Sequence, residues 1–292
     1  MYKIYEIEDT DKYYPQNLLK YAKHPKKIYL IGNKKILNNR CVVIVGSRDN
    51  TSYGEYYASF FAKELAKIGI TVVSGLAVGI DTIAHKNSLN EKGKTIAVIG
   101  SGFNNIYPKE NTELVKQIIK NGGAIISEYP PDTEVDLSNF PKRNRIIAGL
   151  GKCTIVVEAK FRSGSSITAK FTKEQGKPVF CIPGKIGTKT SVGTNNLIKK
   201  GAFILTDINQ VLEIYGKQRL KSLDIARQGI SKIKIQKKYL EIYKLINKTQ
   251  VSINEIAITL NMDISEVTTK ISMMELDGLI EILPGNVIKI KE

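Results

Sequence analysis

The chain of 292 residues is 42% apolar and 25% charged, which is typical of a soluble globular protein with one large and one small domain. No apolar run approaches the roughly 20 residues that cross a bilayer, and the N-terminus is too acidic for a signal peptide. These features predict a cytoplasmic protein without a membrane contact. The cysteines stand on apolar runs without CxxC spacing and are expected to be reduced core residues: Cys41, Cys153 and Cys181.

The net charge of +16 favours a polyanionic partner, although a lysine-rich composition alone gives the same total. Residues 236–292 carry seven Lys and eight Asp or Glu, so residues 1–235 hold a net charge of +17. Only seven of the 44 basic residues are Arg. Four of them stand in or beside glycine-rich or turn-like motifs, where the geometry of the guanidinium group matters: Arg48, Arg143, Arg145 and Arg162.

Residues 1–40 show weak periodicity and are interpreted as an N-terminal lead-in segment. From residue 41 to residue 216, strand-like apolar runs alternate with helical patterns. The predicted strands are 41–46, 70–74, 95–100, 123–127, 153–158, 178–182 and 202–205. The predicted helices are 53–68, 79–91, 109–121, 141–150, 164–176, 193–200 and 207–215. This alternation predicts a Rossmann-like, doubly wound and mostly parallel α/β sheet, which binds ligands at the carboxyl ends of its strands.

The C-terminal part of the chain is predicted to be a separate small domain. Residues 217–235 are polar and basic and are interpreted as a linker. Residues 236–292 show helical patterns at 237–247, 252–260 and 264–279, then two short strands around a turn at 284–286, which together predict a winged helix-turn-helix. Ser252 and Glu255 form a capping box at the second helix. The presumed recognition helix is acidic apart from Lys270, so we expect a protein contact or a weak DNA role.

The first motif is the glycine-rich end of the strand at 41–46. Gly46 permits a tight turn and a close approach of a ligand to the backbone, and Ser47 follows it. Arg48 adds a planar, permanently charged fork that suits phosphate. Because the next helix starts a few residues later, its N-terminal N–H groups lie near as well. A phosphate group is therefore the expected ligand of this loop.

Two further loops follow the next two strands. In the loop after the strand at 70–74, Gly75 and Gly79 allow a ligand to approach the backbone closely. Asp81 and His85 are four residues apart on the following helix, and we interpret them as a structural polar pair rather than a catalytic one. In the loop at 100–111, Phe103 and Tyr107 suit base stacking and Lys109 suits a phosphate, while a packed turn at Tyr107-Pro108 is an equally good interpretation.

The densest motif begins at Phe140. Pro141 suits the first helical position, and Lys142, Arg143 and Arg145 then crowd the positive end of the helix dipole. An anionic ligand offsets that unfavourable placement, and a neighbouring aromatic ring suits single-stranded nucleic acid. The alternative is a solvated basic helix face.

The loops after the remaining strands are also small, polar or basic, as in Ser163-Gly164-Ser165, Pro183-Gly184 and residues 193–199. Loops of this kind after six consecutive strands favour a polymer along the sheet edge over one small ligand. No general acid–base pair with a nucleophile and no metal cluster emerges, so no catalytic residue, metal or cofactor is expected. Glu158 is the best isolated carboxylate and is interpreted as an anchor for a neighbouring Arg.

Together these motifs resemble the bacterial DNA-processing protein A (DprA/Smf) family. The resemblance runs from about Tyr14 to Gly216, and the winged helix extends it. It is carried by Gly-Ser-Arg at 46–48, Ser-Gly-Leu-Ala-Val-Gly-Ile-Asp at 74–81, Phe-Pro-Lys-Arg-Asn-Arg-Ile-Ile-Ala-Gly-Leu at 140–150, and Gly-Thr-Asn-Asn-Leu-Ile at 193–198. Many members carry a sterile-alpha-motif-like domain at the N-terminus, for which 40 residues leave no room.

The resemblance implies a non-catalytic, single-stranded DNA-binding protein that protects incoming DNA and loads the RecA recombinase during natural transformation and recombination. It also implies a homodimer. The DNA-contacting positions that it implies are Gly46, Ser47, Arg48, Gly75, Lys109, Phe140, Lys142, Arg143 and Arg145.

Two other functions fit a glycine-rich sheet of this kind. One is a nucleoside-monophosphate hydrolase of the LOG type, which splits ribose from base and uses a Pro-Gly-Gly-x-Gly-Thr loop. Here Pro183-Gly184 is followed by Lys185, so that loop is missing. The other is a nucleotide-sensing module without turnover.

Overall fold

The structure is a computed structural model that describes residues 2–216, 239–246, 251–276, 279–283 and 287–290. Backbone contacts divide the chain into two units, residues 1–218 and 219–292, and each is described by itself. The predicted linker at 217–235 lies outside the described residues.

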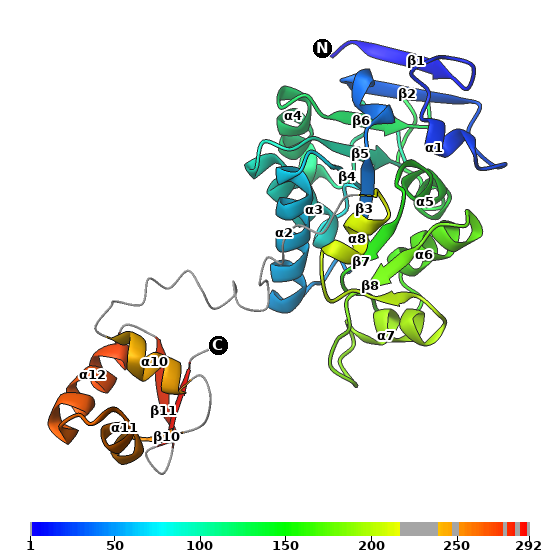
Figure 1. The fold of residues 1–292 in the computed structure, drawn as a ribbon. Coiled ribbons are helices and arrows are strands. Elements are labelled where there is room, and N and C mark those ends of the chain that lie inside the picture. The colour runs from blue at the N-terminus through cyan, green and yellow to red at the C-terminus, as the bar shows by residue number, and fades with distance from the viewer. Residues whose placement is uncertain (1, 217–238, 247–250, 277–278, 284–286, 291–292) are drawn as a thin grey trace. The chain divides into compact units, whose positions relative to one another are not determined.

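The larger unit is built on a nine-stranded sheet (Figure 1). In chain order the strands are β1 (Ile4–Glu8), β2 (Lys27–Gly32), β3 (Cys41–Val45), β4 (Thr71–Ser74), β5 (Thr95–Ile99), β6 (Ala124–Ser127), β7 (Thr154–Val156), β8 (Val179–Cys181) and β9 (Phe203–Ile204). Their spatial order is β1-β2-β6-β5-β4-β3-β7-β8-β9, and all neighbours from β6 to β9 are parallel. The predicted Rossmann-like, mostly parallel sheet is confirmed.

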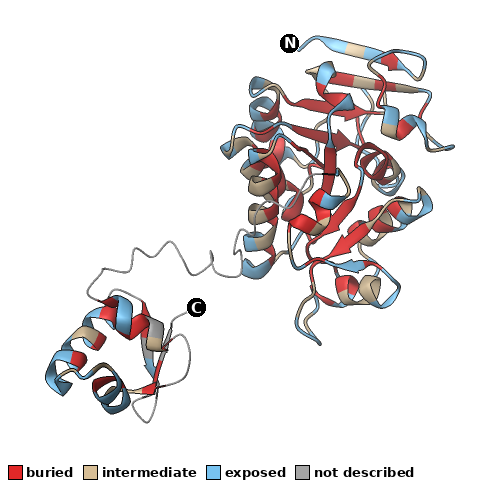
Figure 2. Cartoon of the chain, in the orientation of Figure 1, coloured by how far each residue is buried: buried red, intermediate tan, exposed pale blue. Residues whose placement is uncertain are grey.

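Helices cover both faces of this sheet. The first set is α2 (Ser52–Lys67), α3 (Ile80–Asn90) and α4 (Thr112–Lys120), which lie on one face (Figure 1). On the other face lie α5 (Asn139–Leu150) and α6 (Gly164–Glu174), and the chain continues with α7 (Val192–Lys199) and α8 (Asn209–Glu213). Because both faces are covered, all residues of β3 and β5 are buried, as the red central strands of Figure 2 show.

Residues 1–40, interpreted from the sequence as a lead-in segment, contribute two strands to the sheet of the larger unit. β2 pairs antiparallel with β6, with Tyr29 opposite Ser127, and β1 pairs antiparallel with β2. A short helix, α1 (Gln16–Leu19), and a 3-10 turn, η1 (Lys34–Asn38), connect these strands to each other and to β3. Only Ile7 is buried in β1, and β2 combines three buried with three partly buried residues, so the apolar signal of these strands is weaker than that of a strand buried on both faces.

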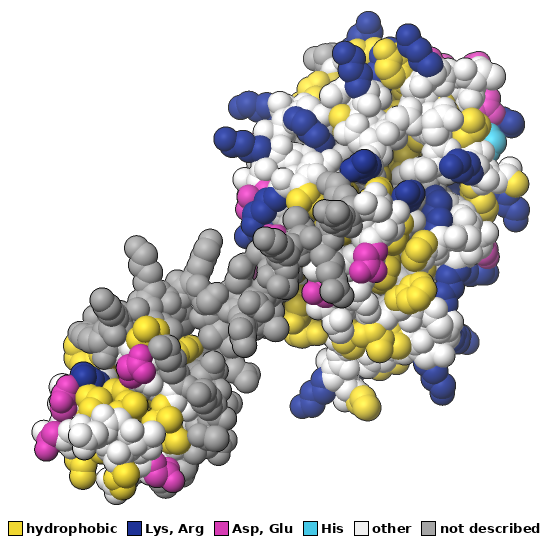
Figure 3. Space-filling model, in the orientation of Figure 1, with side chains coloured by type: hydrophobic (Ala, Val, Ile, Leu, Met, Phe, Trp, Pro, Cys, Tyr) yellow, Lys and Arg dark blue, Asp and Glu magenta, His cyan; other side chains and the backbone are white. Residues whose placement is uncertain are grey.

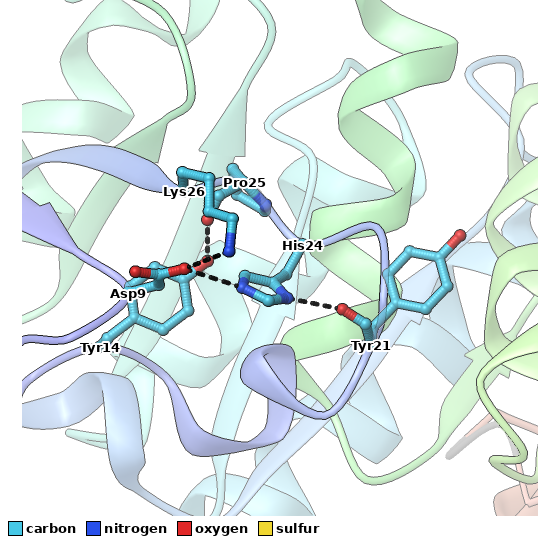
Figure 4. Close-up of polar contacts among 6 residues, drawn as sticks. All are labelled: Asp9, Tyr14, Tyr21, His24, Pro25 and Lys26. Atoms are coloured by element: carbon cyan, nitrogen blue, oxygen red, sulfur yellow. Dashed lines mark hydrogen bonds and ion pairs between the residues drawn. The ribbon is translucent and has the colours of Figure 1, made fainter.

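A polar cluster fixes the segment before β2 against the end of β1 (Figure 4). The carboxylate of Asp9 accepts from Lys26 Nζ at 2.9 Å and contacts His24 Nε2 at 3.2 Å. The hydrogen bond from Lys26 has the largest effect and that from His24 the next largest, and both lower the pKa of Asp9. The buried hydroxyl of Tyr14 donates to the carbonyl of Pro25. The N-terminal strands are therefore held by tertiary contacts as well as by the sheet.

The smaller unit contains α10 (Leu240–Ile246), β10 (Val251–Ser252), α11 (Ile253–Leu260), α12 (Ile264–Leu276), β11 (Ile280–Leu283) and β12 (Val287–Ile290). Its strands form a sheet of order β10-β12-β11, and the predicted turn at 284–286 lies outside the described residues. The capping box is confirmed, because the Ser252 amide donates to Glu255 Oε2 at 2.7 Å and the Glu255 amide donates back to Ser252 Oγ at 3.3 Å. Lys270 is paired with Glu266 at 2.7 Å, which leaves α12 little free positive charge.

The three cysteines are buried and free, and burial raises the pKa of Cys41, Cys153 and Cys181 to about 12. Among the helices in the described ranges, none combines the length and the apolar character that crossing a bilayer requires. Within the same ranges, no three His, Cys, Asp or Glu side chains gather to hold a metal ion.

Candidate nucleic-acid interface

The order of the strands places a crevice between β3 and β7. From β3 the chain proceeds to β4, β5 and β6 on one side, and α5 then carries it back to β7 on the other side of β3. Such a reversal is the topological switch point of a doubly wound sheet, where ligands bind outside the carboxyl ends of the strands. A cavity of about 490 Å³, which we call the switch-point cavity, opens there. Its walls come from the loop after β3 (Gly46, Ser47, Arg48, Asp49), the start of α5 (Phe140, Pro141, Arg143, Asn144) and the segment after β7 (Lys160, Ser163, Gly164, Ser165).

The loop after β3 is shaped by the loop after β4. The Ile80 amide donates to the Ser47 carbonyl at 3.1 Å. Gly79 has a φ of +79°, and a Cβ there would overlap the carbonyl oxygens of Ser47 and Arg48. A Cβ at Gly46 would lie 2.6 Å from Ile80 Cγ1. The close packing of these two loops buries Ser47 and leaves Arg48 exposed at the cavity.

The loop that contains Gly75 is held from both sides by buried charges. Its amide donates to Asp81 Oδ2 at 3.0 Å, and its carbonyl accepts from Arg143 Nη1 at 2.8 Å. Arg143 also donates to the carbonyl of Val98. Burial lowers the pKa of Arg143 to about 10, against the opposing effect of Asp81, and burial likewise raises the pKa of Asp81. Arg143 is only 6% exposed, so its guanidinium ties loops together at the back of the cavity.

The N-terminus of α2 is already occupied by a protein carboxylate. Glu158 accepts from the Thr51 amide at 2.9 Å and from the Thr51 hydroxyl at 2.7 Å. Gly54 leaves the necessary room, because a Cβ there would overlap the carboxylate. Glu158 therefore caps a helix and does not anchor an Arg. The helix ends available to a ligand at this cavity are those of α5 and α6.

The start of α5 carries the aromatic part of the site. The helix begins at Asn139, two residues before the predicted start, so Pro141 lies inside the first turn. The half-buried ring of Phe140 lines the cavity and stacks on Tyr107 with 5.6 Å between ring centroids. A Cβ at Gly100 would lie 2.8 Å from the Phe140 ring. Tyr107 is thus packed on a neighbour, as the packed-turn interpretation expects. It is also 42% exposed, which leaves part of its ring available for base stacking.

The remaining basic positions lie outside the cavity walls. Arg145 is paired with Glu128, with 2.6 Å between Nη2 and Oε1. Lys109 and Lys142 are exposed. The structure thus brings five of the expected positions to the cavity and leaves four out of its lining. The five are Gly46, Ser47, Arg48, Phe140 and Arg143, and the four are Gly75, Lys109, Lys142 and Arg145.

An ion pair at the mouth of the cavity was missed by the sequence reasoning. Lys160 Nζ and Asp49 Oδ2 are 2.5 Å apart, and both side chains are largely exposed. The hydrogen bond to Lys160 lowers the pKa of Asp49. The sequence signal that could have indicated it is Lys160 itself, a basic residue that follows the end of β7 and stands two residues after Glu158.

Asp81 and His85 do not form a pair. Asp81 faces the Gly75 loop, whereas His85 Nδ1 lies 2.6 Å from Thr95 Oγ1. The Thr95 hydroxyl donates to the carbonyl of Val72, so the imidazole donates to Thr95 through Nδ1. His85 Nε2 is buried and has no hydrogen-bond partner among the described residues. Burial lowers the pKa of His85 to about 3.

His85 therefore predicts a loss of stability in acid. Between pH 6.5 and about 3 the unfolded chain binds a proton at this residue that the folded chain does not, so the free energy of unfolding falls as the pH falls. We expect the variant His85→Leu to lose less stability over this range, with a difference of up to roughly 4 kcal/mol at the acid end. Urea unfolding of both proteins at several pH values measures it. Parallel pH profiles contradict the prediction.

The larger unit is a Rossmann-like domain whose switch-point cavity receives two helix N-termini, an exposed Arg and a Lys, and the smaller unit is a winged helix. The chain belongs to the DNA recombination-mediator protein A (DprA/Smf) family, whose model matches residues 6–216, while the model of the DprA winged helix domain matches residues 236–286. The resemblance to this DNA-processing family is confirmed.

Several relatives and solved structures are similar to the chain. Protein Smf of Escherichia coli K12 is 35% identical over 288 residues, which cover 98% of this chain and 77% of that protein. The X-ray structure of DprA from Streptococcus pneumoniae has a TM-score of 0.67 and 40% identity, and covers 72% of this chain and 74% of that one. DprA from Helicobacter pylori, described for its single-stranded DNA binding mode, has a TM-score of 0.66 and 32% identity over 73% of this chain and 96% of that one.

Proposed function

We propose that this protein binds single-stranded DNA at the carboxyl edge of its sheet and acts as a non-catalytic mediator of recombination. The convergence of the α5 and α6 N-termini with Arg48 and Lys160 around one open cavity carries the proposal. Helix N-termini and cations favour a phosphate, and the ring of Phe140 beside them favours a stacked base. The basic side chains spread over the larger unit in Figure 3 suit a long polyanion. The single-stranded DNA binding of the Helicobacter pylori relative supports the same substrate.

The proposed contacts fall into three groups. Gly46, Ser47 and Arg48 hold a phosphate, and Phe140 stacks on a base. Arg143 acts through Gly75, whose loop it positions, because its Nη1 donates to the carbonyls of Gly75 and Val98 and its Nε donates to Asn144 Oδ1. The outer contacts are the exposed Lys109 and Lys142, together with Arg145. Because Arg145 is paired with Glu128, a DNA phosphate contacts it alongside that carboxylate.

A binding role fits the polar groups better than catalysis does. Asp81 and His85 face different partners, and both carboxylate oxygens of Glu158 are engaged by Thr51. The size of the switch-point cavity suits a mononucleotide, which keeps a LOG-like hydrolase or a nucleotide sensor as the second candidate.

A competition assay tests the proposed function against the second candidate. Labelled single-stranded DNA is bound to the purified protein and displaced by unlabelled single strand, duplex or nucleoside monophosphates. We expect the single strand to compete best and no free base to appear. Displacement by monophosphates at equal nucleotide concentration favours the sensor, and released base establishes the hydrolase.

At the level of the cell, we propose a cytoplasmic homodimer that protects incoming DNA and loads RecA in natural transformation. The edge strand β9 exposes Phe203 and Ile204, and an apolar sheet edge favours association. The description of the family as a recombination mediator supports the RecA contact. Sedimentation velocity of the protein, alone and mixed with RecA, tests both points. A monomer at every concentration contradicts the dimer, and unchanged boundaries on mixing contradict the contact.

A further inference from the structure

A second cavity, of about 530 Å³, lies beside the switch-point cavity along the sheet edge. Its lining includes Thr51, Tyr53, Glu158, Pro183, Lys185 and Thr188, which follow β3, β7 and β8. The switch-point cavity uses the same loops a few residues away, at Asp49 and Lys160. Neighbouring strands are about 4.8 Å apart, so the two cavities lie within reach of consecutive parts of one extended ligand.

The ring of Tyr53 forms a rigid wall of the second cavity. Its hydroxyl donates to the carbonyl of Pro183 at 2.8 Å, which bridges α2 to the loop after β8. Tyr57 packs edge-on against it, with 4.7 Å between ring centroids. Because the ring is fixed and still 42% exposed, it offers a flat surface to a ligand at little entropic cost.

Charge orients the ligand within the cavity. The buried Glu158 carboxylate repels an anion from the inner end, whereas the exposed Lys185 attracts one to the rim. A nucleotide therefore fits with its base inward and its phosphate outward. The loop that carries Lys185 continues to Ile186, which is 92% exposed, and to the exposed Lys189.

We propose that the second cavity is a base-binding subsite for the same single strand that occupies the switch-point cavity, with the base on Tyr53 and a phosphate at Lys185. This inference rests on the proposed function and extends the strand from the β3–β7 crevice toward β8. It assigns to the loop at 184–189 the role of the outer wall of a nucleotide site.

The chain contains no tryptophan, so single substitutions give unique fluorescent reporters. The variant Tyr53→Trp reports on the second cavity, Tyr107→Trp on the side of the switch-point cavity, and Tyr2→Trp before β1 on a distant surface. Each is titrated with oligothymidylates from about 4 nucleotides upward. We expect stacked bases to quench the first two reporters and not the third, with Tyr53→Trp needing the longer oligonucleotides.

A second substitution separates contact from indirect change. Adding Lys185→Ala is expected to weaken quenching in Tyr53→Trp several-fold and to leave Tyr107→Trp unchanged. In the protein without a tryptophan reporter, Tyr53→Leu is expected to lower the affinity for a long oligonucleotide roughly tenfold. Its affinity for the shortest oligonucleotide that binds is expected to stay unchanged. Tyr53→Phe is expected to retain most of the affinity for the long oligonucleotide. This pair serves if the tryptophan variant does not fold.

The outcomes distinguish the subsite from the proposed function. Quenching in Tyr107→Trp with none in Tyr53→Trp at any length, or equal affinity of Tyr53→Leu and Tyr53→Phe, overturns the subsite and leaves single-stranded DNA binding intact. Absence of any binding by fluorescence anisotropy overturns both.

Discussion

Replacing Arg48 with Ala is expected to weaken binding of single-stranded DNA roughly 10- to 100-fold. The side chain is exposed at the switch-point cavity, between helix N-termini and Lys160, and a charge-assisted hydrogen bond to phosphate contributes about 1.5–3 kcal/mol. Loss of one phosphate contact also lowers the slope of log affinity against log salt by about 0.7 for a single strand. Anisotropy titrations at several salt concentrations measure both quantities.

Lys120→Ala is the matched control for this substitution. Lys120 is exposed at the end of α4, which precedes β6 and so lies at the amino edge of the parallel strands. This substitution removes one positive charge from the same unit, as Arg48→Ala does, and we expect only a small drop in the affinity for single-stranded DNA. Equal effects of the two substitutions mean that total charge governs binding, and that contradicts a phosphate site at Arg48.

Replacing Gly79 with Ala is expected to disrupt both the fold and the DNA site. The residue has a φ of +79°, and its new Cβ would meet the backbone oxygens of Ser47 and Arg48. Backbone atoms cannot rotate away as a side chain does, so the loop after β3 must shift. Left-handed strain together with overpacking is expected to cost roughly 3–5 kcal/mol. Urea unfolding measures the stability, and anisotropy measures the affinity of whatever remains folded.

Gly69→Ala is the control for a positive φ without a collision. Gly69 has a similar φ of +75°, but no atom lies within 4 Å of the position of a Cβ. We expect a loss of only about 1 kcal/mol and unchanged DNA binding. If the two variants unfold at the same urea concentration, the packing of the two loops does not determine the shape of the site.

The central sheet was predictable because its strands are buried on both faces. The runs CVVIV at β3 and TIAVI at β5 are continuous and β-branched, which leaves no competing helical period. The strands β1 and β2 escaped prediction because β1 has one buried residue and half of β2 is only partly buried, which weakens their apolar pattern. β10 escaped it as well, since two residues are too few to show any period.

The position of a cavity residue was predictable where it depends on the residue's own loop, as for Arg48, which is exposed at the cavity. It was not where the role depends on a partner far along the chain. Arg143 serves the carbonyl of Gly75, 68 residues away, and Glu158 caps a helix 107 residues before it. A sequence motif gives the type of a side chain but not its direction, so the backbone partners of Arg143 and the helix cap of Glu158 could not be predicted.

The ion pair between Asp49 and Lys160 bears on how long a strand stays bound. In the proposed complex, a phosphate that approaches Lys160 would compete with a carboxylate already 2.5 Å away, so binding would exchange one ionic partner for another. When the strand left, Asp49 would pair with Lys160 again, as it does in the structure. Such an exchange would lower the net gain from the contact and ease departure of the strand, which fits the proposed transfer of the DNA to a recombinase.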